Sequence, residues 1–539
     1  MLATMSSAVV SGVDGHPVSV EVHAGNGLPS FTIVGLPDTS CREARDRVRA
    51  AILSSGLTWP VQRVTVNLAP SDIRKVGAGL DLPIALCVLA ASKQIEAHQL
   101  IGVGAVGELG LDGSLRSVNG LVSMAAAVAC TDLIVPVGRS AEAALVRPGS
   151  VREASHLRQV VDGLTGDGPL PPLVELSGTV ENLDRRPELA DVRGQAIARL
   201  ALEIAAAGGH HLLMVGSPGA GKTMLAHRLV GLLPDLDPAD ALTVTKIHSV
   251  AGVIGPIQGL VLRPPFRAPH HGASAVALIG GGTSAIRPGE ISLSHSGVLF
   301  LDELGEFPVV VLEALRQPLE EGVVRVSRAA ASATMPARFQ LVAAMNPCPC
   351  GEGFGAGQCR CSDAARARYA RRLSGPLLDR FDLRIEVAPP DPALLLGRPV
   401  EDSRSGSTAQ GSTVQGSTSQ GSTSQGSTAQ GALGEESTAV VGARVAKARA
   451  IARCRGVRSN AELAVEQLDK VAALSPGARR VAERSLAAGE LTGRGLRRAR
   501  TVALTIADLR GDEGPVDADD LQLALSLRVR PFSVLGVGR

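Results

Sequence analysis

A phosphate-binding pattern, G-x-x-x-x-G-K-[ST], occupies eight consecutive residues: Gly216, Ser217, Pro218, Gly219, Ala220, Gly221, Lys222 and Thr223. The apolar run 212–215 before it predicts a buried strand, and residues 223–233 after it predict a helix. Glycines in such a loop let backbone N–H groups surround phosphate oxygens at a helix N-terminus. The lysine then reaches the β- and γ-phosphates, and the threonine hydroxyl binds Mg²⁺. The pattern predicts a site for ATP and Mg²⁺.

A second motif, Val298-Leu-Phe-Leu-Asp302-Glu303, is an apolar strand that ends in two carboxylates. One carboxylate is enough to hold a metal ion, so the adjacent pair indicates hydrolysis as well as binding. We expect Asp302 to hold the Mg²⁺ and Glu303 to polarise the attacking water. The alternative is a pair of exposed acids at a strand end.

Two further candidate residues lie next to predicted apolar strands, Asn346 after one strand and Arg380 before another. The predicted strand 339–344 leads to Asn346, which is placed to contact the attacking water or the γ-phosphate. Arg380 stands before the predicted strand 383–387. An arginine offered to a neighbouring subunit's γ-phosphate stabilises the charge that develops there. A surface salt bridge is the alternative for Arg380.

Four cysteines form a C-x-C pair, a gap of eight residues and a second C-x-C pair: Cys348, Cys350, Cys359 and Cys361. Four thiols that lie close together in the folded chain suit a tetrahedral Zn²⁺ ion. The one-residue spacing is tighter than the common two to four, so reduced thiols that brace a loop remain a second interpretation. The sequence leaves both open.

Composition divides the chain into an α/β region over 1–165, a linker over 166–188, an ATPase core over 189–395 and a helical region over 441–539. In the core, short apolar strands alternate with helical sequence, which is typical of a parallel sheet. Between the core and the helical region, 396–440 contains five GST-x-Q pentads. These carry no core-forming side chain, so we expect a disordered tether.

Whole-chain composition excludes several classes of protein. The 539 residues carry a net charge of +2, which excludes a polycationic coat for nucleic acid, and aromatic residues are 2% of the chain, which disfavours a base-stacking surface. The sequence predicts no membrane span and no secretory signal, so we expect a cytoplasmic protein without a membrane partner. Eight cysteines in that compartment argue against a disulfide scaffold.

The assembled motifs resemble an AAA+ ATPase, and other segments resemble the magnesium-chelatase-like ComM/YifB family. The segments that carry this likeness are 191–195, 205–210, 265–271, 288–295, 346–351 and 374–382 in the core, and 27–29, 34–38, 64–70, 81–83 and 107–109 in the N-terminal region. The resemblance covers nearly the whole chain except the pentads.

The resemblance implies a P-loop AAA+ core, a Lon-protease-like (S5-like) N-terminal domain and a C-terminal helical lid. It implies a homo-oligomeric ring, a hexamer in our expectation, that drives DNA branch migration without reading sequence. It also places Arg380 as the trans-acting arginine finger and Arg494 as the lid arginine. Thr492 and Gly493 stand where a serine and an alanine are usual, so Arg498 is the other candidate for the lid arginine.

Three other questions arise from this interpretation. A protease would need a nucleophile near Lys75, but Gly77, Ala78 and Gly79 carry no side-chain oxygen, so we expect no peptidase activity.

Two rival functions remain: a motor subunit for Mg²⁺ insertion into a porphyrin, and an ATP-switched assembly or chaperone factor. The segment 322–328 predicts a strand leading to a hairpin, where Arg325 and Arg328 would meet DNA phosphates unless the hairpin is merely solvated.

Overall fold

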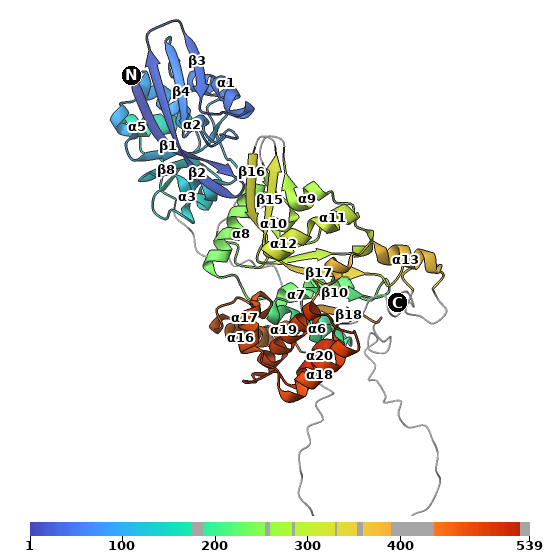
Figure 1. The fold of residues 1–539 in the computed structure, drawn as a ribbon. Helices are drawn as coiled ribbons and strands as arrows, with labels where there is room; N and C mark the ends of the chain where they lie inside the picture. The colour runs from blue at the N-terminus through green and yellow to red at the C-terminus, as the bar shows by residue number, and fades with distance from the viewer. Residues whose placement is uncertain are drawn as a thin grey trace, which may run out of the picture. The chain divides into compact units, whose positions relative to one another are not determined.

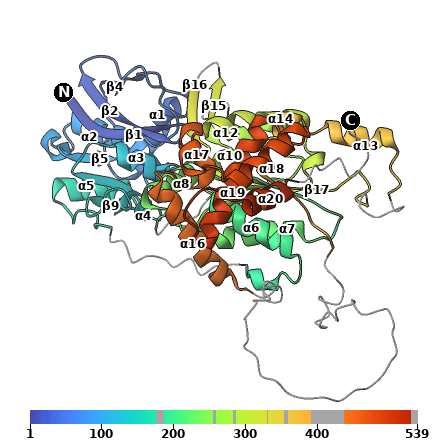
Figure 2. The ribbon, with the colours of Figure 1, turned by 60° about the horizontal axis from the view of Figure 1, so that its bottom comes forward.

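A computed structural model shows the fold (Figures 1 and 2) and describes residues 1–174, 187–253, 259–282, 286–328, 331–352, 359–389 and 436–528. The five pentads lie outside these residues, as does most of the predicted linker. The chain divides into two compact units. Unit 1 comprises 1–184, 235–299 and 310–339, and unit 2 comprises 185–234, 300–309 and 340–539.

The N-terminal part of unit 1 is built on a mixed seven-stranded sheet of order β3-β4-β2-β1-β5-β8-β9. Its strands are β1 (Leu2–Ser11), β2 (Asp14–Gly25), β3 (Ser30–Val34), β4 (Arg63–Ala69), β5 (Val103–Ala105), β8 (Asp132–Pro136) and β9 (Val151–Ala154). The β1–β2 and β2–β4 pairs are antiparallel, whereas β3–β4, β1–β5, β5–β8 and β8–β9 are parallel. A small ribbon pairs β6 (Glu108–Leu109) with β7 (Leu115–Arg116).

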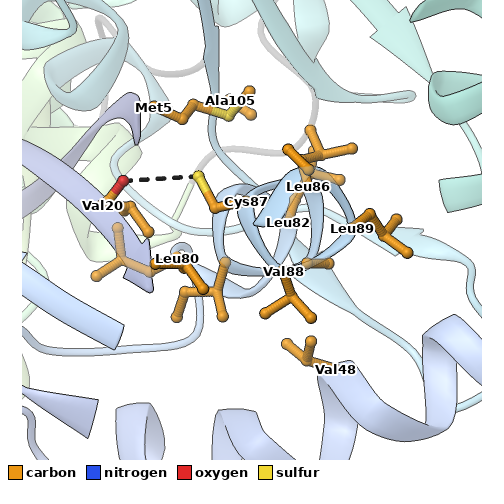
Figure 3. Packing of buried hydrophobic residues seen from close by; sticks show 14 of the residues in the cluster. Met5, Val20, Val48, Leu80, Leu82, Leu86, Cys87, Val88, Leu89 and Ala105 are labelled. Carbon is orange, nitrogen blue, oxygen red and sulfur yellow. Dashed lines mark hydrogen bonds between the residues drawn. The ribbon is translucent and has the colours of Figure 1, made fainter. Parts of the chain in front are cut away.

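Helix α2 (Asp81–Ala91) is the centre of this region, because all eleven of its residues are buried. It packs among side chains of the sheet and of α1, including Met5, Val20 and Val48 (Figure 3). Its first residue, Asp81, is tied to Arg47 by a 2.6 Å ion pair. The other helical segments here are α1 (Thr39–Ser54), η1 (Ala97–Leu100), α3 (Leu121–Ala127), α4 (Ser140–Ala144) and α5 (Leu157–Thr165).

The rest of unit 1 comes from the centre of the chain. It consists of α8 (Pro238–Ala251), β11 (Phe266–Arg267), α9 (Ala275–Ile279), β12 (Gly280–Gly281), β13 (Arg287–Pro288), α10 (Glu290–Leu293), α11 (Val309–Ala314), α12 (Arg316–Glu321), β15 (Val323–Arg328) and β16 (Ala331–Pro336). The β15–β16 pair confirms the predicted hairpin. Helix α8 is joined to the N-terminal part by a buried hydrogen bond of 2.7 Å from Ser249 to the Glu142 carboxylate.

Unit 2 carries most of the parallel sheet that the sequence predicts. The strand order is β11-β14-β17-β10-β18, with β14 (Val298–Leu301), β17 (Gln340–Met345), β10 (Leu212–Val215) and β18 (Leu383–Glu386). Every residue of β10, β14 and β17 is buried, as expected for central parallel strands. The accompanying helical segments are η2 (Leu189–Asp191), α6 (Ala196–Gly208), α7 (Lys222–Leu232), η3 (Leu304–Glu306), α13 (Asp363–Arg371) and α14 (Gly375–Leu378).

The C-terminal region is helical, as predicted. It contains α16 (Thr438–Cys454), η4 (Asn460–Glu462), α17 (Val465–Val471), α18 (Pro476–Ala487), α19 (Gly493–Arg510) and α20 (Ala518–Ser526). Helix α16 begins at Thr438, three residues before the predicted helical region over 441–539, because the Ser437 side chain caps it by accepting a hydrogen bond from the Val440 N–H. Among the described residues, no helix combines the length and apolarity needed to cross a membrane.

We expect Leu86→Ala to destabilise unit 1, because Leu86 is fully buried in α2 and its truncation leaves a cavity. A loss of about 2–5 kcal/mol corresponds to a melting temperature lower by about 4–20 °C, measured by calorimetry. Leu53→Ala in α1 is the matched control, since Leu53 is 51% exposed and should change the melting temperature little. Equal effects of the two variants would contradict the assignment of α2 to the core.

Candidate functional site

The phosphate loop lies between β10 and α7, and its backbone requires glycine. A Cβ atom on Gly216 would lie 2.4 Å from the carbonyl oxygen of Val387, which follows β18. Gly219 and Gly221 have φ angles of +79° and +84°, a region that disfavours other residues. Gly221 is the N-cap of α7, so the loop ends where backbone N–H groups and the helix dipole favour an anion.

Lys222 is 8% exposed, and its ammonium group folds back over the loop. Nζ donates to the carbonyl oxygens of Gly216 at 2.7 Å and Ser217 at 2.9 Å. It also donates to Oδ1 of Asn346 at 3.2 Å, which joins the loop to the end of β17. Burial lowers the pKa of Lys222, while the carboxylates of Asp302 and Glu303 act in the opposite direction.

The two expected Mg²⁺ ligands are in contact. The Thr223 hydroxyl donates to Oδ2 of Asp302 at 2.7 Å, so oxygens from the phosphate loop and from the end of β14 lie side by side. A hydroxyl and a carboxylate are oxygen ligands of the kind that Mg²⁺ prefers. Both residues belong to unit 2, and their arrangement fits a Mg²⁺ ion shared with a bound triphosphate.

Glu303 has a left-handed backbone conformation, with φ at +52°, although it is not glycine. Its N–H donates to Oδ1 of the preceding Asp302 at 2.9 Å, which fixes this turn directly after the strand. Non-glycine residues in this region carry a cost of about 1–3 kcal/mol and are frequent at functional sites. The turn leaves the Glu303 side chain exposed beside the Thr223–Asp302 pair.

Two residues with no role predicted from the sequence, Gln195 and Tyr369, contact the phosphate loop and Asn346. Gln195, also left-handed at φ +53°, donates from Nε2 to the carbonyl oxygens of Ala220 at 2.8 Å and Ala388 at 3.1 Å. The Tyr369 hydroxyl of α13 donates to the Asn346 carbonyl oxygen at 3.3 Å. Gln195 lies in one of the segments that resemble the family, but nothing in the sequence singles out Tyr369 apart from its being the sole tyrosine.

Arg498 and Arg494 differ in their surroundings, although both lie in α19. Arg498 forms an ion pair with the Asp382 carboxylate and donates to the Arg380 carbonyl oxygen at 2.9 Å. Burial raises the pKa of Asp382, but His210, Arg498 and His211 together hold it far below its usual range. Arg494 is exposed in the first turn of the helix. Arg498 is therefore engaged in contacts within the fold near Arg380, whereas Arg494 is exposed to solvent.

The four predicted cysteines are gathered in one place, and their sulfur atoms all lie within 4.8 Å of one another. Cys348 Sγ is 3.3 Å from Cys350 Sγ and 3.6 Å from Cys359 Sγ. All four are free thiols, so the structure contains no disulfide among them. The cluster begins two residues after Asn346.

Comparison with known proteins gives three family matches. The description "Magnesium chelatase, subunit ChlI" covers residues 188–394, "Subunit ChlI of Mg-chelatase" covers 20–138, and "Magnesium chelatase, subunit ChlI C-terminal" covers 435–528. Together with the phosphate loop and its neighbouring parallel strands, these matches define an AAA+ ATPase that uses ATP and Mg²⁺.

Relatives that are similar over most of the chain identify the family within the AAA+ ATPases. Competence protein ComM of Haemophilus influenzae is 42% identical over 95% of this chain and 94% of its own length. Proteins named YifB are 41% identical in Salmonella typhimurium, over 98% of this chain and 97% of the relative, and 45% identical in Escherichia coli, over 76% and 80%. The chain belongs to the magnesium-chelatase-like ComM/YifB family.

We expect Arg498→Met to destabilise unit 2 by about 3 kcal/mol, since it leaves the Asp382 carboxylate nearly buried without its guanidinium partner. The value is at the lower end for a broken buried pair because Arg498 is 26% exposed. Thermal unfolding measures the loss. Arg494→Met, the same change one helical turn earlier, should leave the melting temperature unchanged; a comparable loss there would contradict the distinction.

Proposed function

We propose that this protein is an ATP-driven DNA motor that assembles as a homo-oligomeric ring, most simply a hexamer, and migrates DNA branches during recombination. The observation that carries the ATPase part is the pair of hydrogen bonds that link Thr223 to Asp302 and Lys222 to Asn346. They bring four side chains from three separate parts of the sequence to one edge of the sheet. The DNA part is supported by the 42% identity to a relative named for competence.

Each residue has a defined task in this proposal. The backbone of residues 216–223 surrounds the phosphates, and Lys222 exchanges its carbonyl partners for β- and γ-phosphate oxygens. Thr223 and Asp302 hold the Mg²⁺, which neutralises charge on the phosphates. Glu303 orients and polarises the attacking water, and Asn346 contacts the γ-phosphate. Because Asn346 already bonds to Lys222, loss of that phosphate changes a contact at the end of β17.

Arg380 completes the site of a neighbouring subunit in this proposal. It is half-buried after α14, and its backbone is held by the Arg498 bond described above. An arginine in such a rigid turn can present its guanidinium to the γ-phosphate across a subunit interface. Arg494, exposed at the start of α19, supplies the lid contact to nucleotide.

DNA contacts are assigned to the hairpin of β15 and β16. Arg325 on β15 is 55% exposed, and its ion-pair partner among the described residues is Glu321, which is 41% exposed. A phosphate can replace such a contact at little cost. Arg328 ends β15, and the next two residues lie outside the described chain. Arg267 is less suited, because two hydrogen bonds of 2.6 and 2.8 Å hold it to Glu290. Binding through exposed arginines would be independent of sequence and sensitive to salt.

The N-terminal domain is proposed to be Lon-like in fold but without peptidase activity. Lys75 is fully buried, and its ammonium group donates to the Pro70 carbonyl oxygen. A cavity of about 950 Å³ in unit 1 is lined by the neighbours Arg74, Val76 and Gly77 but not by Lys75. The Lys75 amine therefore does not line this cavity.

The chelatase function remains the second candidate, because all three family descriptions name that enzyme's subunit. One of them covers residues 20–138, so the N-terminal domain does not by itself separate the two functions. An ATP-switched assembly factor is disfavoured by Glu303, since a switch has no need of a hydrolytic acid. The DNA dependence of hydrolysis distinguishes these possibilities.

We expect branched or single-stranded DNA to stimulate ATP hydrolysis, and Glu303→Gln to lower turnover by about 10²–10⁴-fold while ATP still binds. Phosphate release measures turnover, and a fluorescent nucleotide measures binding. Glu466→Gln, an exposed acid in α17, is the control and should behave as the parent protein. Hydrolysis without any response to DNA, together with no DNA binding at moderate salt, would refute the motor while leaving the ATPase intact.

We expect two inactive variants to restore activity when mixed. Lys222→Ala cannot bind phosphate, and Arg380→Ala should lose about 10³-fold or more in turnover because it lacks the finger. A mixed ring contains some interfaces with an intact Lys222 and an intact Arg380 from different chains, so hydrolysis should partly recover. Mixing Lys222→Ala with the Lys222→Ala/Arg380→Ala double variant is the control. No recovery in the first mixture would place Arg380 outside the neighbour's site.

A further inference from the structure

The cysteine cluster sits on the loop that leaves β17 directly after Asn346. Cys348 is fully buried, Cys350 is exposed, and Cys359 and Cys361 are half-buried immediately before α13. The cluster thus joins two segments: the residues that follow Asn346 and the residues that start α13. A bond between the cysteines would add to the Tyr369–Asn346 hydrogen bond that already links these two segments.

The sulfur positions fit one tetrahedral ion. Zn–S bonds of about 2.3 Å place the sulfur atoms of a tetrahedral site about 3.8 Å apart. The Cys348–Cys359 and Cys350–Cys359 distances are both 3.6 Å, and every pair lies within 4.8 Å. These distances far exceed the S–S bond length of about 2.05 Å, so the arrangement is not that of a disulfide. Four thiols fill the coordination shell, which is the mark of a structural site.

Hydrogen-bond donors lie around the cluster. Backbone N–H groups of Glu352 and Arg360 hydrogen-bond to the Cys350 sulfur. The Arg366 guanidinium of α13 hydrogen-bonds to the Cys359 sulfur. Four thiolates around a divalent cation carry net negative charge, which these donors offset. Such outer contacts orient the ligands of a metal site.

The cluster also touches the nucleotide site. Gly351 has φ +84°, and a Cβ atom there would lie 2.6 Å from Cδ and Cγ of Pro218 in the phosphate loop. On the other side, α13 carries Tyr369 to the Asn346 carbonyl oxygen. The Tyr369 ring also covers Gly305, beyond the acidic turn, where a Cβ atom would lie 2.5 Å from the ring. The phosphate loop, Asn346 and Gly305 are all in contact with the two segments that the cysteines join.

We propose that Cys348, Cys350, Cys359 and Cys361 bind a structural Zn²⁺ that holds Asn346 and α13 in place against the phosphate loop. The ion itself does not depend on the proposed function, whereas its effect on turnover rests on it. Tyr369 is then a positioning residue: it acts on nucleotide only through the backbone of Asn346. Reduced thiols without metal would leave the same loop held by weak contacts alone.

Metal content tests the ion directly. The full-length protein, purified under reducing conditions without chelator, should contain about one zinc per chain. Replacement by Co²⁺ should give the strong visible absorption of a tetrahedral tetrathiolate. Cys359→Ser/Cys361→Ser should abolish both signals, and Cys454→Ser, an exposed cysteine outside the cluster, should preserve them. Zinc near zero, or a Co²⁺ spectrum unchanged in the double variant, would overturn the site whether or not the protein hydrolyses ATP.

Kinetics test the positioning role. We expect Tyr369→Phe to lower kcat with little change in KM and in zinc content, because it removes only the hydroxyl that supports Asn346. Zinc removal from the parent protein should lower kcat about 10–100-fold, and readdition of zinc should restore it. Unchanged kcat after complete zinc loss would overturn the positioning role while leaving the metal site. If Glu303→Gln also failed to affect turnover, the proposed ATPase site itself would be at fault.

Discussion

The parallel pairing of β10 with β17 is the constraint on which the nucleotide site depends. The register opposes Val215 to Met345, and the Gly216 N–H donates to the Met345 carbonyl oxygen at 3.1 Å. Both strands therefore end at the same level of the sheet, and the next residues along each chain emerge side by side. Lys222 meets Asn346 for this reason, although 124 residues separate them.

Hydrogen bonds from neighbouring side chains support the backbone around the nucleotide site. Gln195 fixes the carbonyl oxygen of Ala220, Tyr369 fixes that of Asn346, and Arg372 donates to that of Gly305 at 2.7 Å. Each contact bonds a side chain to a backbone oxygen, so it positions the reactive residues without competing for the ligand. Preorganised donors and acceptors of this kind reduce the reorganisation that catalysis would otherwise require.

Residues at the ends of predicted strands could be identified from the sequence, because a local pattern fixes both the strand and the residues directly after it. The phosphate loop, Asp302, Glu303 and Asn346 are of this kind. Tyr369 could not be identified, because its task depends on α13 folding back across 23 residues, and local periodicity carries no information on that return. The contact between Gly351 and Pro218 and the order of the N-terminal sheet escaped prediction for the same reason.

The C-terminal helical region belongs to unit 2, the same unit that contains the phosphate loop. Thr438 accepts a hydrogen bond of 2.7 Å from the Leu189 N–H, and Arg449 donates to the Ala206 carbonyl oxygen at 2.7 Å. In the sequence, the pentads stand between β18 and α16, which belong to the same unit. Doubling the length of a flexible connection costs only about 0.6 kcal/mol in closure entropy, so the tether that the pentad composition predicts should tolerate the gain or loss of one GST-x-Q copy with little effect on folding.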